Sequence, residues 1–135
     1  MPDHEVAMIA YVKLADLSQQ KNQMQGRDKF LVLAGAAACR AGWPDVTRRC
    51  RALIISNNCA HLIRKSKTFS DAMRDDEFQP FLKQLERFCS YEQSEHLLSQ
   101  LNLEPGLPKD KQSISSGEYA LQLLTGPHWP TLENQ

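Results

Sequence analysis

The longest apolar run of the chain predicts a helix that is covered on several sides. Ten consecutive residues without a charged side chain extend from Phe30 to Cys39. A helix that is apolar on all its faces needs neighbours around it, so we expect residues 27–41 to form the central helix. Ala34, Gly35 and Ala38 give this helix one shallow face, on which we expect the backbone of another helix to lie close. The run is about half as long as a bilayer crossing requires.

A second apolar stretch near the N-terminus also has helical spacing. Apolar residues recur there at positions that share one side of a helix: Val6, Ile9, Ala10, Leu14 and Leu17. Asp3 can cap such a helix. Because residues 18–23 are polar, we predict a helix over about residues 4–24 whose second half projects into water. Gly26 is expected to end it.

Capping signals divide the remainder of the chain into shorter helices. Gly42 is expected to end the central helix, and Pro44 suits the first turn of the next one. A hydroxyl residue followed three positions later by an acid or glutamine predicts helix starts at Thr68, Ser90 and Ser115. Strand patterns are nearly absent. The sequence therefore predicts an all-α fold, a compact bundle of about six or seven helices built from antiparallel helical hairpins.

The composition changes after Asn102, where two prolines and a glycine follow within six residues. We therefore divide the chain into a helical domain, residues 1–104, and a segment, residues 105–135, that contains a linker, a short docking helix and an extended tail. A short isolated helix is marginal in water. We expect this one to dock on its own chain, with exchange between two copies as the alternative. If the segment instead binds a partner, its apolar docking residues are Tyr119, Leu123 and Trp129.

The chain has no net charge, but its charges are separated along the sequence. Residues 40–67 carry seven basic and one acidic side chain, whereas residues 68–104 carry eight acidic and three basic ones. Either the two parts pack together and pair their charges, or the first forms a basic interaction face. The candidate residues of that face are Arg48, Arg49, Arg51, Arg64, Lys65 and Lys67. We expect the three arginines of the helix after Gly42 to point largely outward.

Nucleic acid is the alternative partner for this basic stretch, but the sequence does not favour it. Aromatic residues interleaved with the basic ones, on which single-stranded bases would stack, are missing from the stretch. A helix-turn-helix around Gly42 would need buried apolar residues where Arg48 and Arg51 stand.

Signatures of catalysis, cofactor binding and metal binding are absent from the sequence. Glu92 and His96 could share one helix face, and Cys59 and His61 are close in sequence, but neither pair has the spacing of a metal site. We therefore assign no catalytic, cofactor-binding or metal-binding residues. The four cysteines contain no Cys-x-x-Cys pair and are expected to be reduced and buried in the core. The N-terminus has no secretory pattern, so we expect a cytoplasmic protein without a membrane partner.

Residues 30–58 resemble one helical hairpin of the tetratricopeptide type. Leu33 and Ala34 stand where that family has a large and a small residue, Gly42 lies in the turn, and Val46, Cys50 and Leu53 take the inward positions. The resemblance covers a single unit and implies an antiparallel helix pair. The interpretation that follows is a protein-interaction or accessory module whose partner is another protein or a second copy. A nucleic-acid-associated protein is the alternative, and a small-molecule enzyme without a recognisable motif is the third interpretation.

Overall fold

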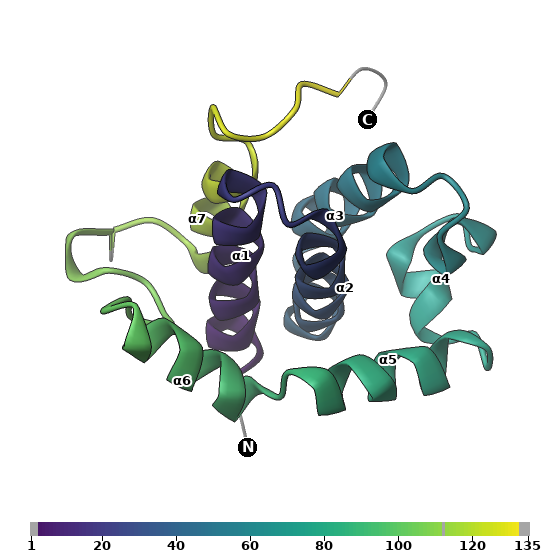
Figure 1. The fold of residues 1–135 in the computed structure, drawn as a ribbon, viewed down its shortest axis with the longest axis horizontal. Coiled ribbons are helices and arrows are strands. Elements are labelled where there is room, and N and C mark those ends of the chain that lie inside the picture. Colours follow the sequence, from purple (N-terminus) through teal and green to yellow (C-terminus); the bar gives the residue numbers. More distant parts are fainter. Residues whose placement is uncertain (1–2, 112, 133–135) are drawn as a thin grey trace.

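The computed structural model describes residues 3–111 and 113–132. Within these ranges the chain forms helices and no strand (Figure 1). The α-helices are α1 (His4–Gln20), α2 (Met24–Ala41), α3 (Pro44–Asn57), α4 (Phe69–Met73), α5 (Phe78–Phe88), α6 (Tyr91–Gln100) and α7 (Ser116–Leu124). Two short 3₁₀ helices, η1 (Leu62–Lys65) and η2 (Lys109–Lys111), lie between them.

The helices form a compact bundle around α2, which confirms the predicted all-α fold. α2 packs against α1 and α3, and it also contacts α4 and α5. Eight consecutive residues of α2, 31–38, are buried, as the long apolar run predicts. Helices α5 and α6 follow one another along one end of the bundle, and α7 lies beside α1 (Figure 1).

Three helices end in the same hydrogen-bonding pattern, with a residue in the left-handed conformation. After α2 this residue is Gly42, with φ of 83°, and the Trp43 amide donates to the carbonyl of Ala38 over 2.9 Å. After α1 this residue is Asn22, with φ of 56°, and after α6 it is Asn102, with φ of 60°. Asparagine adopts this conformation more readily than most residues. The prediction that Gly26 ends the first helix is therefore wrong, because α1 ends at Gln20 and Gly26 lies inside α2.

The shallow face of α2 is covered by an aromatic ring and not by a helix backbone. A Cβ atom on Gly35 would lie 2.2 Å from Cε2 of Phe69. The Phe69 ring is almost fully buried and also meets Phe78 edge to face, with centroids 6.0 Å apart. The expected close contact at Gly35 is present, but the single-turn helix α4 supplies it.

The C-terminal segment packs on the same chain, against α1 and α3. Gly117 lets α7 approach Trp43 so closely that an added Cβ would lie 2.2 Å from the indole. Beyond α7, the Trp129 indole donates a 2.8 Å hydrogen bond to Asp16, and the Arg27 guanidinium lies 5.4 Å from its centroid.

The cysteines do not share one environment, which corrects the expectation that all four are buried. All four thiols are free, but Cys59 is exposed in the turn after α3, and Cys39 is half-buried. Cys50 is fully buried, and the burial raises the pKa of its thiol to about 12. Among the described residues, no helix is both long enough and apolar enough to cross a membrane.

Candidate functional site

One concave surface of the described residues is a groove between α1, the chain that follows α6, and α7. We call it the α1–α7 groove. It encloses about 600 Å³ and is open to solvent. Its apolar lining comes from three separate parts of the sequence, with Leu17 on α1, Leu103 after α6, and Tyr119 and Leu123 on α7.

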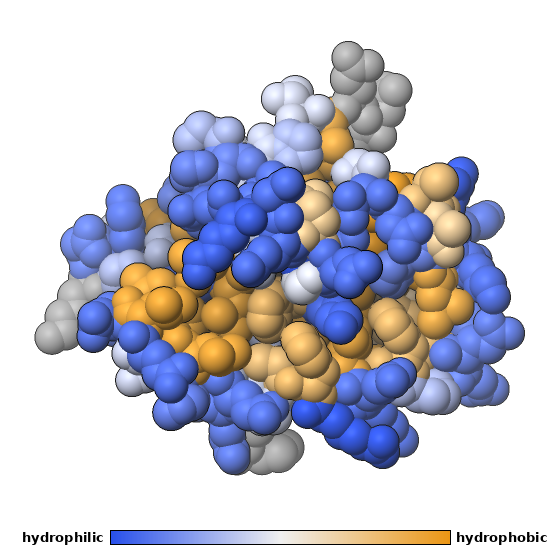
Figure 2. Space-filling view, viewed as in Figure 1, coloured by the Kyte–Doolittle hydropathy of each residue, from blue (hydrophilic) through white to orange (hydrophobic). Residues whose placement is uncertain are grey.

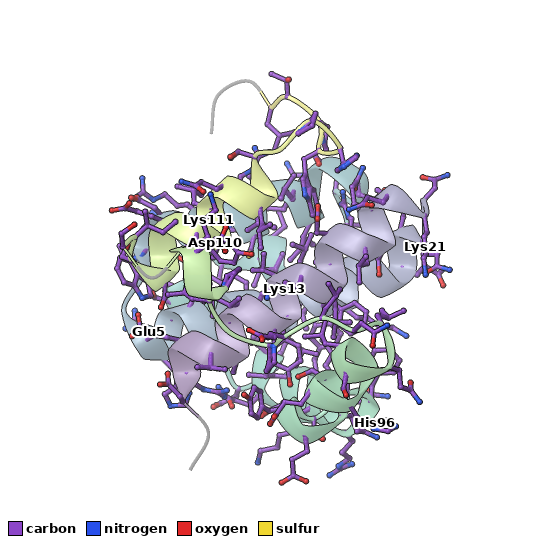
Figure 3. All side chains as sticks on the ribbon, turned by 90° about the vertical axis from the view of Figure 1, so that its left-hand side faces the viewer. Glu5, Lys13, Lys21, His96, Asp110 and Lys111 are labelled. Carbon is purple, nitrogen blue, oxygen red and sulfur yellow. The ribbon has the colours of Figure 1, made fainter. Side chains whose placement is uncertain are left out.

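Lys13 fixes the position of one wall of this groove. Its ammonium group donates to the backbone carbonyls of Glu104, at 2.5 Å, and Gly106, at 2.8 Å, and lies 5.8 Å from the Tyr119 ring centroid. Figure 3 shows Lys13 in the middle of this side of the molecule, between η2 and α7 above and α6 below. Partial burial lowers the pKa of Lys13, while the nearby Glu104 carboxylate opposes that change. The linker is therefore tied to α1 beside the groove.

Exposed leucines extend the apolar surface beyond the groove. Leu97, Leu101 and Leu103 are 39%, 47% and 39% exposed, although Leu98 beside them is fully buried. In Figure 2, orange side chains gather over α6, and paler ones continue across the middle of the same face. Leu97 and Leu101 lie four residues apart and share one face of α6 and its cap. The apolar face of α6 is thus only partly used in folding.

The predicted apolar docking residues separate into two groups. Tyr119 and Leu123 are half-buried and line the α1–α7 groove. Trp129 lies elsewhere and is 5% exposed, because its side chain packs on Arg27 and Asp16.

The six predicted basic residues do not form one continuous face. Arg49 corrects the expectation that it points outward, since it is only 5% exposed. Its guanidinium donates to the carbonyls of Leu124, at 2.9 and 3.1 Å, and of Pro130, at 3.3 Å, and burial lowers its pKa. Arg49 therefore holds the C-terminal segment on α3.

Two more of the basic residues interact with neighbouring loops. Lys65 forms a 3.1 Å ion pair with Glu77, and Arg64 donates to the carbonyl of Cys59 over 3.1 Å. This ion pair joins the basic stretch, residues 40–67, to the acidic stretch, residues 68–104. Such pairing is expected if the two stretches pack together. Both members of the pair are mostly exposed, so its contribution to stability is small.

The other three basic residues meet at a second groove, between α3 and the chain that enters α4. We call it the α3–α4 groove. It encloses about 490 Å³, and Arg48, Arg51 and Lys67 line it. Only part of the predicted basic set therefore converges.

Sequence reasoning missed Lys13, Leu17 and Leu103 as residues of the α1–α7 groove. A local sequence pattern could not group these three residues, because the groove brings together residues that are about ninety positions apart in the sequence. The one available signal was the leucine content of residues 97–103, which exceeds what a single buried helix face needs.

Side chains that can bind a metal ion are dispersed over the described part of the chain. Within residues 3–111 and 113–132, no group of three or more His, Cys, Asp or Glu side chains is placed to hold a metal ion. His61 instead caps η1, where its Nδ1 accepts from the Ile63 amide over 3.1 Å.

Comparisons with known proteins assign neither a family nor a related fold. No protein-family model matches the chain, and neither a curated protein nor a solved structure matches it.

Proposed function

We propose that the chain is a protein-interaction module that binds an amphipathic helix of another protein in the α1–α7 groove. The observation that carries this proposal is the position of Leu103, which lines the groove and is also one of three exposed leucines on α6 and the chain directly after it. Helix recognition in proteins commonly uses an apolar groove that takes side chains spaced three, four and seven residues apart. A partner helix would place such side chains between α1 and α7.

The exposed leucines favour a macromolecular ligand over a small one. A cavity of about 600 Å³ has the size of a small-molecule site. A small molecule in it would, however, leave Leu97 and Leu101 in water, because neither lines the groove. A helix that lies along the groove and over α6 would cover both.

The charges around the groove indicate which partner helix fits. Residues 91–104 carry three acidic side chains and no lysine or arginine. Asp16 and Glu104 line the groove, and Lys13, the one lysine among its described lining residues, donates to backbone carbonyls. The complementary ligand is thus a helix with leucines on one face and lysines or arginines beside it.

The test uses a defined peptide in a fluorescence anisotropy titration. The probe is a 16-residue labelled peptide with leucines at helical spacing and lysines on the remaining positions; a scrambled peptide of the same composition is its control. We expect the helical peptide to bind the full chain. Leu103→Asp should weaken binding at least tenfold, whereas Phe88→Asp, which adds the same charge to an exposed apolar position on α5, should change it less than twofold.

Three results would overturn the proposal. In the first, the scrambled peptide binds as tightly as the helical one. In the second, Phe88→Asp weakens binding as much as Leu103→Asp does. In the third, Leu103→Asp leaves the affinity unchanged. A further contrary outcome is self-association: if sedimentation shows a dimer that Leu103→Asp converts to monomer while the peptide fails to bind, the groove serves a second copy.

We further propose a cytoplasmic location for this module. Its support is the set of four free thiols, a state that a reducing compartment maintains. A fluorescent fusion of the full chain tests it, and accumulation in an oxidising compartment would contradict it.

A further inference from the structure

We infer that the α3–α4 groove is a second, separate binding site, which takes an acidic peptide segment of another protein with one aliphatic side chain seated in the groove. This goes beyond the helix-binding function proposed above and uses different residues. Among the described residues that line this groove, three are cationic and none is acidic. The α1–α7 groove has the opposite balance, with two carboxylates and one engaged lysine.

Arg51 contributes a hydrogen-bonding group that the fold leaves unused. Its terminal nitrogen Nη2 donates to the carbonyl of Ser66 over 2.7 Å, which fixes the guanidinium against the chain before α4. Its Nε is buried and has no hydrogen-bond partner among the described residues. A buried donor without a partner costs free energy. A carboxylate has the planar geometry that accepts from an arginine in this way.

The other two cations are free to turn toward a ligand. Lys67 is exposed and makes no ion pair within the described part of the chain. Arg48 pairs with Asp45 over 2.5 Å, but both side chains are 70% exposed. Exposed pairs of this kind are worth little and exchange readily. Three positive groups can therefore surround one short anionic segment.

The floor of the groove is apolar, which distinguishes it from a plain anion site. Ala52, Ile55, Phe69 and Leu132 are apolar residues that line the groove. Two of its hydroxyl groups already donate within the fold, Thr47 to the carbonyl of Pro44 and Ser56 to the carbonyl of Leu53. An aliphatic side chain between two acidic residues matches this arrangement of an apolar floor and a basic rim.

Nucleic acid fits the same groove less well. Single-stranded binders stack bases on exposed aromatic rings, but the one aromatic side chain here, Phe69, is 2% exposed and packs edge to face on Phe78. A track of phosphates also needs several cations in a row. Of the neighbouring basic residues, Arg49 is buried under the C-terminal segment and Lys65 pairs with Glu77.

The experiment measures the binding of two labelled peptides to the full chain by fluorescence anisotropy. The first peptide has a central leucine between two glutamates on each side, and the second has serine in place of leucine. We expect the leucine peptide to bind more tightly, and binding to weaken as salt is raised. Arg48→Glu with Lys67→Glu should reduce the affinity at least tenfold. The matched control, Arg87→Glu with Lys83→Glu on α5, makes the same charge change at exposed positions outside the groove and should cost less than twofold.

Ile55→Ser tests the apolar floor independently of charge. It should remove the preference for the leucine peptide and leave the serine peptide unaffected, with circular dichroism and the melting temperature reporting whether each variant is folded. The inference is overturned if neither peptide binds, if both charge-reversal pairs weaken binding equally, or if leucine gives no advantage. A tighter complex with a single-stranded oligonucleotide also overturns the inference, provided that Arg48→Glu with Lys67→Glu abolishes oligonucleotide binding and the control pair does not. The groove would then be a nucleic-acid site. These results are independent of the test of the α1–α7 groove. That test substitutes Leu103, which lies outside the α3–α4 groove.

Discussion

Replacing Gly35 with alanine should destabilise the protein although alanine is the better helix former. Gly35 lies in the middle of α2, where alanine is favoured over glycine by about 1 kcal/mol. The new Cβ would lie 2.2 Å from Cε2 and 2.5 Å from Cζ of Phe69. Carbon atoms pack at about 3.5–4.0 Å, so the ring has to move by more than about 1 Å.

The magnitude follows from how tightly Phe69 is held. Its ring is 2% exposed and packs edge to face on Phe78, so a movement away from Gly35 disturbs that contact. Overpacking a core typically costs about 1–3 kcal/mol, and we take the upper end for a ring displaced this far. After subtracting the gain in helix propensity, Gly35→Ala should lower the free energy of unfolding by about 2 kcal/mol. For a domain of this size the corresponding loss in melting temperature is about 6–10 °C.

Urea unfolding followed by circular dichroism measures the change, and two further variants test its cause. Gly26→Ala is the matched control in the same helix, since the nearest atom to its Cβ is the Ser18 hydroxyl at 3.9 Å, and it should be neutral or stabilising. In a Phe69→Leu background the clashing ring atoms are absent, so Gly35→Ala should change from destabilising to neutral or stabilising. If Gly35→Ala is equally destabilising with leucine at 69, the contact with the ring is not the reason for glycine.

Three further predictions concern thiols, alkaline pH and the C-terminal segment. In the native state Ellman's reagent should modify Cys59 rapidly and leave Cys50 unmodified until denaturation; rapid loss of both would contradict the burial of Cys50. The raised pKa of Cys50, about 12 when folded against 9.0 unfolded, contributes stability that is present below pH 9 and is lost as the pH rises from 9 toward 12. Urea titrations should show this loss at up to about 1.4 kcal/mol per pH unit, and Cys50→Ala should make the slope shallower. Arg49→Met should cost about 1.5–3 kcal/mol and speed proteolysis after α7, because the carbonyls of Leu124 and Pro130 lose their donor; an unchanged cleavage rate would mean that the segment is held by other contacts.

The helices were predictable wherever a local physical signal exists. The apolar run of α2 and the caps at Thr68, Ser90 and Ser115 are present as expected, because burial on all faces and capping hydrogen bonds depend on residues within a few positions. The end of α1 was missed because Asn22 adopts the left-handed conformation that the sequence analysis assigned to a glycine.

Side-chain environments that depend on distant residues were not predictable. Arg49 has the sequence context of an exposed helix residue, but it is buried by a segment 75 residues further along the chain. Cys59 is of a residue type that is usually buried, yet it is exposed in the turn in which it lies. The two grooves were only partly predictable for the same reason, since each of them combines residues from at least three separate parts of the sequence.

The packing of α7 on α1 has a consequence for the synthesis of this protein on the ribosome. Helix α1 is synthesised before α7, which lies beside it in Figure 1. Residues 7–12 of α1 are all buried in the finished structure. At about 5–20 residues per second, roughly 5–20 s pass between the appearance of α1 and that of α7. During this time the side of α1 on which α7 packs is uncovered, so chaperones that bind apolar segments should associate with ribosomes that have not yet translated residue 116.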